Sequence, residues 1–168
     1  MSKAKVPDAL TAERLRAAVF YESDTGLFYR LPRAANRNYE RPCGTVNKVI
    51  GYSIVSVDAK QRYAHRLAWL YVYGQWPNGS IDHINGVRTD NRIQNLRDVS
   101  HKTNMQNIRA ANRRNASGFL GVMPSLSKWQ AQINIDGKQT YLGSFDTPEL
   151  AHEAYVSAKR KHHAGCTI

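Results

Sequence analysis

The stretch that most constrains this chain is residues 81–107, IDHINGVRTDNRIQNLRDVSHKTNMQN, in which short apolar runs alternate with turn-forming residues. Gly79–Ile84 and Leu96–Val99 predict two short strands with polar loop residues between them. Ser100 has the chemistry of an N-cap, and the helix that it begins is expected to end near Asn112. Strand, loop, strand and helix predict a compact hairpin-plus-helix unit.

The net charge indicates what kind of partner the chain binds. Its 168 residues carry 24 basic and 13 acidic side chains, for a formal charge of +11 and a pI near 9.9. Residues 1–50, 51–110 and 111–168 contribute +4, +4 and +3, so the excess is spread along the chain. A distributed positive field suits a long polyanion, DNA or RNA, better than a membrane. Many soluble proteins are also basic, so charge alone decides nothing.

The cysteines and the first residues indicate the compartment. Cys43 and Cys166 form no CxxC pair and no Cys/His spacing suited to zinc, so we expect a reduced protein without structural zinc. The first ten residues hold no apolar leader, and no run reaches the length of a membrane span. We therefore expect a soluble, cytoplasmic protein without membrane contact.

The sequence before the central stretch predicts a helix, three strands and a second helix. They span Leu10–Tyr21, Leu27–Leu31, Gly44–Val46, Tyr52–Val57 and Ala64–Tyr73. Thr11 is the expected N-cap of the first helix and Gly74 the C-cap of the second, while residues 58–61 predict a turn. For His65, at the start of the second helix, a packing or hydrogen-bonding role is the better reading than a catalytic one.

An arginine occurs at every fourth position of the proline-bounded segment 32–42, at Arg33, Arg37 and Arg41. Such a segment is poor core material and suits phosphate contacts. A merely solvated loop is an equally good reading of it.

The segment 113–118 has the composition of a linker and includes Arg113 and Arg114, which suit DNA contact. We expect a first domain over 1–112, with its core motif at 79–112, and a second over 119–168. Three strands and one helix are predicted in the second domain, at 119–123, 129–135, 140–142 and 147–162. The expected fold class is α+β.

The central stretch carries residues suited to phosphodiester hydrolysis. His83 can serve as a general base because its pKa lies near neutral, and Asp82 and Asn104 supply hard oxygen ligands suited to Mg²⁺ or Mn²⁺. Adjacent residues of a regular strand point to opposite faces, so we expect a distortion or a strand end at Asp82-His83. Asn95 is placed to tie down the loop and to orient His83.

The pattern Asp82-His83, Asn95-Leu96-Arg97, Asn104 and Asn107 resembles the HNH nuclease motif, a ββα-metal unit, in its phage and intron homing-endonuclease branch. The preceding GYSIVSVDAKQRYAHRLAWLYVYG is similar to the segment that commonly precedes that motif. The resemblance implies His83 as base, Asp82 and Asn104 as ligands of one divalent ion (Mg²⁺ or Mn²⁺), and Asn95 as support for the base. Asn107 is then a supporting residue or a phosphate contact. For His101, near the start of the helix, a phosphate contact or a capping neighbour is a better reading than the base.

Residues 117–163 are similar to an AP2 DNA-binding domain, a three-stranded antiparallel sheet with one helix. The matching segments are Gly121-Val122, Lys128-Trp129, Tyr141-Leu142-Gly143, Phe145-Asp146-Thr147 and Ala151 with Ala154-Tyr155. The resemblance implies DNA contacts from residues exposed on or beside the strands: Lys128, Trp129, Gln130, Gln132, Asn134 and Lys138. The strands lack the arginines usual in that family, and a packing role for Trp129 is an equal reading. A sheet that merely packs against the nuclease half is the alternative to DNA reading.

Together the two resemblances imply a metal-dependent endonuclease acting on double-stranded DNA as a monomer or weak dimer. A single active site per chain implies nicking of one strand per binding event. If the protein is phage-encoded, its place of action is the host bacterial cytoplasm. A non-catalytic DNA-binding regulator built on an HNH scaffold is the alternative, and a nuclease of structured RNA is a weaker one.

Overall fold

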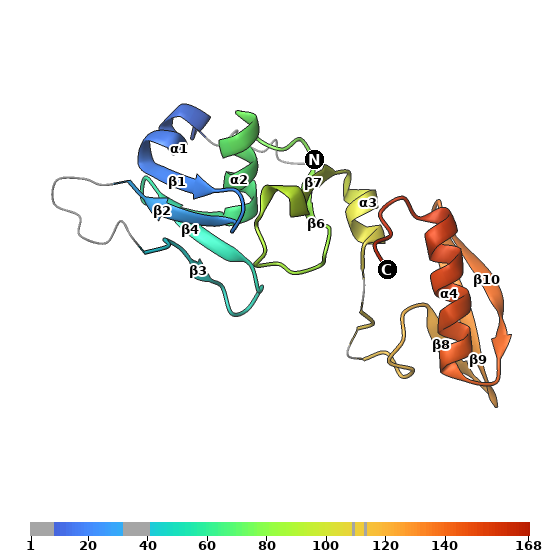
Figure 1. Ribbon diagram of the computed structural model, residues 1–168. Coiled ribbons are helices and arrows are strands. Elements are labelled where there is room, and N and C mark those ends of the chain that lie inside the picture. The colour runs from blue at the N-terminus through green and yellow to red at the C-terminus, as the bar shows by residue number, and fades with distance from the viewer. Residues whose placement is uncertain (1–8, 32–40, 109, 113) are drawn as a thin grey trace, which may run out of the picture. The chain divides into compact units, whose positions relative to one another are not determined.

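The chain forms two compact units of mixed helices and small antiparallel sheets, Met1–Asp98 and Val99–Ile168 (Figure 1). The computed structural model describes residues 9–31, 41–108, 110–112 and 114–168. The division between Asp98 and Val99 differs from the boundary predicted at 113–118, because the helix after Val99 groups with the later elements. No helix of the described ranges is long and apolar enough to cross a membrane.

The first unit begins with a short helix and a hairpin. Helix α1 (Ala12–Ala18) starts at the predicted N-cap Thr11, whose side chain accepts a hydrogen bond from Arg14 N. Strand β1 (Val19–Glu22) follows and pairs antiparallel with β2 (Leu27–Arg30). The prediction of a helix up to Tyr21 is therefore wrong from Val19 onward. β-branched and aromatic side chains favour a strand once a pairing partner is present, and β2 supplies it.

A three-stranded antiparallel sheet comes next, in the order β3–β4–β5. Its strands are β3 (Thr45–Val46), β4 (Ser53–Val57) and β5 (Lys60–Tyr63). The turn predicted over 58–61 is only Asp58-Ala59, both in the left-handed region, so the prediction missed β5. Helix α2 (Ala64–Tyr73) has the predicted bounds and ends at Gly74 with φ 77°.

The core of the first unit surrounds α2, which packs against α1 (Figure 1). Its buried apolar side chains come from α1, β1, β2, β4, α2, β6 and β7, and from Leu10 before α1: Leu10, Ala12, Leu15, Val19, Tyr21, Phe28, Val55, Val57, Ala64, Leu67, Ala68, Leu70, Ile81 and Leu96. This shared core fixes the strand that carries Asp82 and His83, because Ile81 lies in it.

The central stretch has the strand, strand and helix order of a ββα unit. Strand β6 (Ser80–His83) pairs with β7 (Leu96–Val99), and a 3-10 turn η1 (Ile93–Asn95) lies just before β7. Helix α3 (His101–Gln106) is capped by Ser100 as predicted. Its predicted extension to Asn112 is wrong, since Asn107 ends the helix with ψ 17°.

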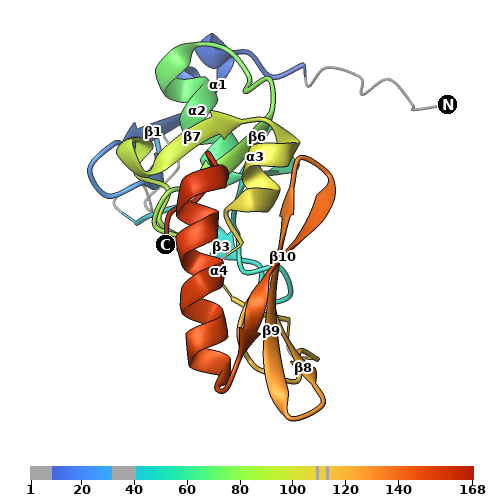
Figure 2. The same cartoon turned by 90° about the vertical axis from the view of Figure 1, so that its right-hand side faces the viewer.

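The second unit also contains a sheet in the order β10–β9–β8 with one helix along it (Figure 2). The strands are β8 (Val122–Ser125), β9 (Lys128–Ile135) and β10 (Lys138–Phe145), and α4 spans Pro148–His162. A small core of Val122, Ala131 and Ala151 joins sheet and helix.

Two strand bounds in the second unit differ from the prediction. The strand expected at 119–123 begins only at Val122, because Ser117 bonds to Phe119 and Val122 in a turn before it. The strand expected at 140–142 extends over all of β10, since β9 offers it a long pairing partner across the Asp136-Gly137 turn.

Candidate active site

Asp82 and His83 end strand β6 and are both buried, with 7% and 4% of their surface exposed. The chain turns immediately afterwards, where Gly86 N donates to His83 O at 2.8 Å. Ile84 N donates to Asn95 O at 2.9 Å, which joins this turn to the residues before β7. We expect a distortion or a strand end at Asp82-His83, because both side chains are to serve one site. The strand does end at His83.

The His83 ring is oriented by Asn91. The Asn91 side-chain amide donates to Thr89 O at 3.1 Å, so its oxygen is the atom that faces the imidazole. His83 Nε2 lies 3.3 Å from this Oδ1, an acceptor that favours the tautomer with the proton on Nε2. In the neutral ring the lone pair is then on Nδ1, which leaves Nδ1 as the basic atom.

Asn91 was not predicted as a functional residue. It is buried with 3% exposed, and its backbone carbonyl accepts from Tyr21 Oη at 2.7 Å. Nothing in the loop sequence distinguishes it from Asn85 or Asn95, because its role depends on a histidine eight positions earlier. The recurrence of asparagines in a loop between two strands is the only signal that sequence offered.

Asn95 fastens the loop between the two strands, as predicted, but in the described part of the chain its side chain bonds to the loop and not to the His83 ring. Its Oδ1 accepts from Asn85 N at 2.9 Å, and its Nδ2 donates to Asn85 Oδ1 at 3.0 Å and to Asp90 O at 2.8 Å. These bonds fix the loop that contains Asn91. In this arrangement Asn95 holds the loop, while Asn91 contacts the ring.

Burial makes His83 a neutral base. Removal from water lowers the pKa of His83, and the bond to Asn91 and the charges of Asp82 and Asp90 oppose that effect. Arg88 lowers the pKa further. Its guanidinium lies 5.1 Å from the centre of the Tyr52 ring, which in turn lies 5.9 Å from the His83 ring.

A second buried histidine packs against His83. The His65 ring meets it edge-on at 5.2 Å and stacks on Tyr63 at 5.4 Å. Burial, with the nearby His83 and Arg66, lowers the pKa of His65 to about 3. Its Nδ1 is buried without a hydrogen-bond partner in the described part of the chain. These contacts agree with the packing role preferred from the sequence.

The donor chemistry of the predicted ligands fits a weakly held, hard divalent ion. Asp82 Oδ2 accepts from Arg97 at 2.7–2.8 Å, which orients the carboxylate. No group of three His, Cys, Asp or Glu that could hold a metal occurs among the described residues. One carboxylate and one amide oxygen suit Mg²⁺ or Mn²⁺, which keep waters and substrate phosphate as ligands, and do not suit zinc.

Three predicted residues of the ββα unit lie in the second unit. Asn104 is half-buried on α3, and its convergence with Asp82 stays a prediction. His101 is exposed at the start of α3, and Asn107 is buried, its Oδ1 accepting from Thr167 Oγ1.

The second sheet presents a polar face. Gln132 is paired with Tyr141 and Asn134 with Gln139 across β9 and β10, and Gln139 Nε2 donates to Gln132 Oε1. Gln130 shares this face by alternation along β9. The face therefore carries amides and one exposed aromatic ring.

The remaining predicted DNA contacts differ in position. Trp129 packs against the core between sheet and α4, so the packing reading holds for it. Lys128 and Lys138 are exposed, and Lys128 Nζ pairs with Asp146 at 3.1 Å. Arg41 and Arg114 are exposed, whereas Arg33, Arg37 and Arg113 lie outside the described residues.

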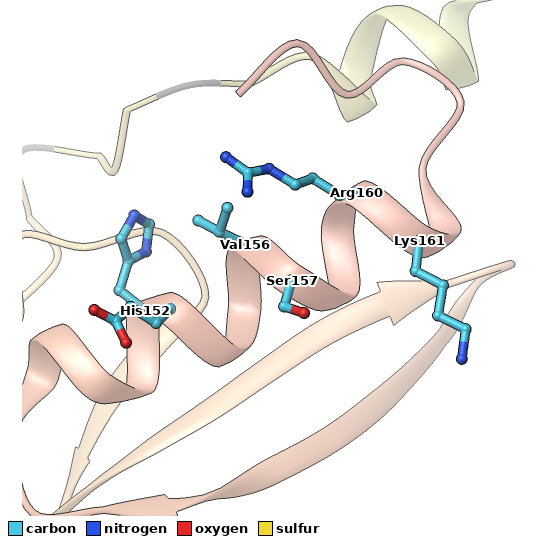
Figure 3. A pocket seen from close by; sticks show the side chains of 6 residues that line it. His152, Val156, Ser157, Arg160 and Lys161 are labelled. Atoms are coloured by element: carbon cyan, nitrogen blue, oxygen red, sulfur yellow. The ribbon is translucent and has the colours of Figure 1, made fainter.

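An open hollow runs along α4, lined by side chains of that helix: His152, Glu153, Val156, Ser157, Arg160 and Lys161 (Figure 3). None of the residues predicted for catalysis, metal binding or DNA contact lines it.

Comparison with known proteins agrees with this geometry. The sequence profile of a family described as HNH endonuclease matches residues 62–106. Protein 3.8 of Escherichia phage T7 is 30% identical over 101 residues, which are 58% of this chain and 83% of that protein. No solved structure matches the chain significantly. The matched range 62–106 includes His65 and all four residues predicted for catalysis and metal binding.

Proposed function

Because the chain belongs to the HNH endonuclease family, we propose that it hydrolyses a phosphodiester bond of double-stranded DNA, with His83 as the general base. The observation that carries the proposal is the contact of the buried His83 Nε2 with Asn91 Oδ1, at 3.3 Å. Because the Asn91 amide nitrogen donates to Thr89 O, this contact favours the tautomer with the proton on Nε2 and the basic lone pair on Nδ1.

In the proposed reaction, Nδ1 of His83 takes a proton from water while the water oxygen attacks the phosphorus. The bond from phosphorus to the 3′ oxygen breaks, and that oxygen is protonated from solvent. The products are a 5′ phosphate and a 3′ hydroxyl. Asn91 keeps the ring oriented during the proton transfer, and Asn95 keeps the loop of Asn91 in place.

HNH nucleases typically use a divalent metal, and we propose that Asp82 and Asn104 hold a single Mg²⁺ or Mn²⁺ here. When bound, such an ion offsets negative charge on the scissile phosphate and the leaving oxygen. Arg97 supports this role by fixing the Asp82 carboxylate at 2.7–2.8 Å.

We further propose that residues 119–168 form an AP2-like module that gives the enzyme its site preference. Gln130, Gln132 and Asn134 lie on one exposed face, where amides can bond the edge of adenine bidentately. Lys128, Lys138, Arg114 and the arginines of 33–41 are proposed to contact phosphates and so to position the duplex.

One active site per chain makes a monomer, or one chain of a weak dimer, a nicking enzyme. The relative in phage T7 supports a phage origin and action in the host cytoplasm. A homing-type role in a mobile element is consistent with nicking at a preferred site.

The test is cleavage of supercoiled plasmids that carry fragments of the source genome, in the presence of Mg²⁺, Mn²⁺ or EDTA. Wild type should convert them to open circles only with metal. His83→Ala should be slower by at least about 100-fold while binding duplex normally, since a general base contributes that much. His162→Ala, which changes an exposed histidine of α4 that has no proposed role in catalysis or binding, is the matched control.

Binding without cleavage by the wild type on these fragments would favour the DNA-binding regulator instead. Cleavage by His83→Ala at the wild-type rate would remove His83 from the mechanism.

A further inference from the structure

Helix α3 buries too little of its own surface to be held in place by packing alone. It has six residues and none of them is buried. A helix of this length is unstable in isolation, and it lacks the apolar stripe that packs most short helices onto a core. Its position must therefore come from other contacts of the second unit, to which it belongs.

Those contacts are polar and come from later in the chain. Residues of α3 and the two that follow it bond to the β9–β10 turn, to α4 and to the segment 163–168. The pairs are Lys102 with Asp136, Gln106 with Gly165, Asn107 with Thr167, and Ile108 with Lys159. The first pair is exposed and contributes little, so the other three carry the attachment.

At Gly165 the backbone of the segment 163–168 lies against helix α3. A Cβ built on Gly165 would overlap the carbonyl oxygen of Thr103 on α3 and lie 3.1 Å from the Gln106 Cβ. Gly165 is buried and does not need a left-handed backbone, so glycine is required here for space alone. The segment 163–168 thus lies directly on α3.

Helix α4 holds this segment from the other side. Arg160 Nε donates to Ile168 O at 3.0 Å, and Figure 3 shows Arg160 projecting from α4 beneath the segment as it returns towards α3. Lys159 is 1% exposed and donates to the Ile108 carbonyl, just beyond α3. A buried ammonium persists only when it is bonded, so this contact is held firmly.

We infer that the segment 163–168 positions α3 for cleavage and that Gly165 and Thr167 are positioning residues of the nuclease. The inference rests on the proposed function, in which α3 supplies the metal ligand Asn104. It follows that the DNA-reading module also carries part of the catalytic machinery. Removal of 119–168 should then abolish cleavage and not merely relax site preference.

Gly165→Ala and Thr167→Val test this. Gly165→Ala pushes the segment off α3, and Thr167→Val removes one hydroxyl without changing shape. In both variants amide hydrogen exchange of 101–107 should accelerate, by about tenfold or more in Gly165→Ala, while β8–β10 keeps its protection. The turnover rate at saturating DNA should fall by about tenfold or more, because misplacement of a reacting group costs that much. Duplex affinity in EDTA should stay within a few-fold of wild type.

The control is Ala164→Ser, an exposed change in the same segment. Unchanged exchange of 101–107 in both variants, or faster exchange with the wild-type turnover rate, overturns the inference. A wild type that fails to cut source DNA refutes the proposed function instead, and the exchange data identify which of the two has failed.

Discussion

The two units use polar side chains in opposite ways. The first buries Asp82, His83, Asn91 and Asn95 among apolar neighbours, and each has a bonded partner. The second displays amides on an exposed sheet face over a small core around Val122, Ala131 and Ala151. A buried, bonded cluster is rigid and fixes a tautomer, whereas an exposed face can adjust to a duplex.

Under the proposed function, this difference should separate the turnover rate from the preference for particular DNA sequences. Changes in the buried cluster should reduce both stability and turnover, because unsatisfied buried groups are costly. Changes on the sheet face should leave stability alone and alter which sequences are cut.

Asn91→Ala should have the largest effect. It removes the bond that fixes the His83 ring, and loss of alignment costs about 100-fold in turnover. It should also lower the free energy of unfolding by about 1–3 kcal/mol, since a buried polar partner is lost. Single-turnover cleavage at a temperature where the variant is folded, with urea unfolding, measures both.

Gln94→Ala, an exposed change in the same loop, serves as its control. Equal turnover in Asn91→Ala and Gln94→Ala would show that the ring needs no support from Asn91.

His65→Phe should change how stability depends on pH. The pKa of His65 is about 3 in the folded protein and about 6.5 when unfolded, so between these values the unfolded chain binds one more proton. Stability is therefore complete above pH 6.5 and falls as the pH drops towards 3. The advantage of His65→Phe over wild type should grow by about 2 kcal/mol from pH 7 to pH 5.

Urea unfolding at the two pH values measures this growth. His101→Phe should follow the wild type, because that side chain is exposed. Parallel stability curves for wild type and His65→Phe would show that His65 is not held neutral by burial.

Gln132→Ala should change preference without changing stability. Gln132 bonds to Gln139 on the exposed face, and one good amide contact to adenine contributes about 1–3 kcal/mol of discrimination. Cleavage of a randomised duplex library should show about a tenfold weaker preference at one position. Ser157→Ala, on the outer surface of α4, is the matched control. An unaltered sequence preference would show that this face does not contact the DNA bases.

Local patterns were enough to predict the elements that are determined locally. The apolar stripe of α2 and Gly74 gave both bounds of that helix, and β7 was placed correctly. Val19–Tyr21 was misassigned to a helix, since the strand it belongs to exists through pairing with β2. The link from Asn91 to His83 and the attachment of α3 to 163–168 both join distant residues. Contacts between residues far apart in the sequence produce no pattern in a short segment of it, so they could not be predicted.

The smallest effect concerns the pH dependence of cleavage. His83 must be neutral to take a proton, and its lowered pKa places the acid limb of kcat/KM below pH 6.5. Arg88 contributes to that lowering through its charge, so Arg88→Gln should move the limb upward and Arg88→Lys should leave it in place. The sheet-face variant Gln132→Ala should keep the wild-type profile. If Arg88→Gln kept it too, the charge of Arg88 would not reach the base, and burial, opposed by Asn91, Asp82 and Asp90, would set the pKa of His83.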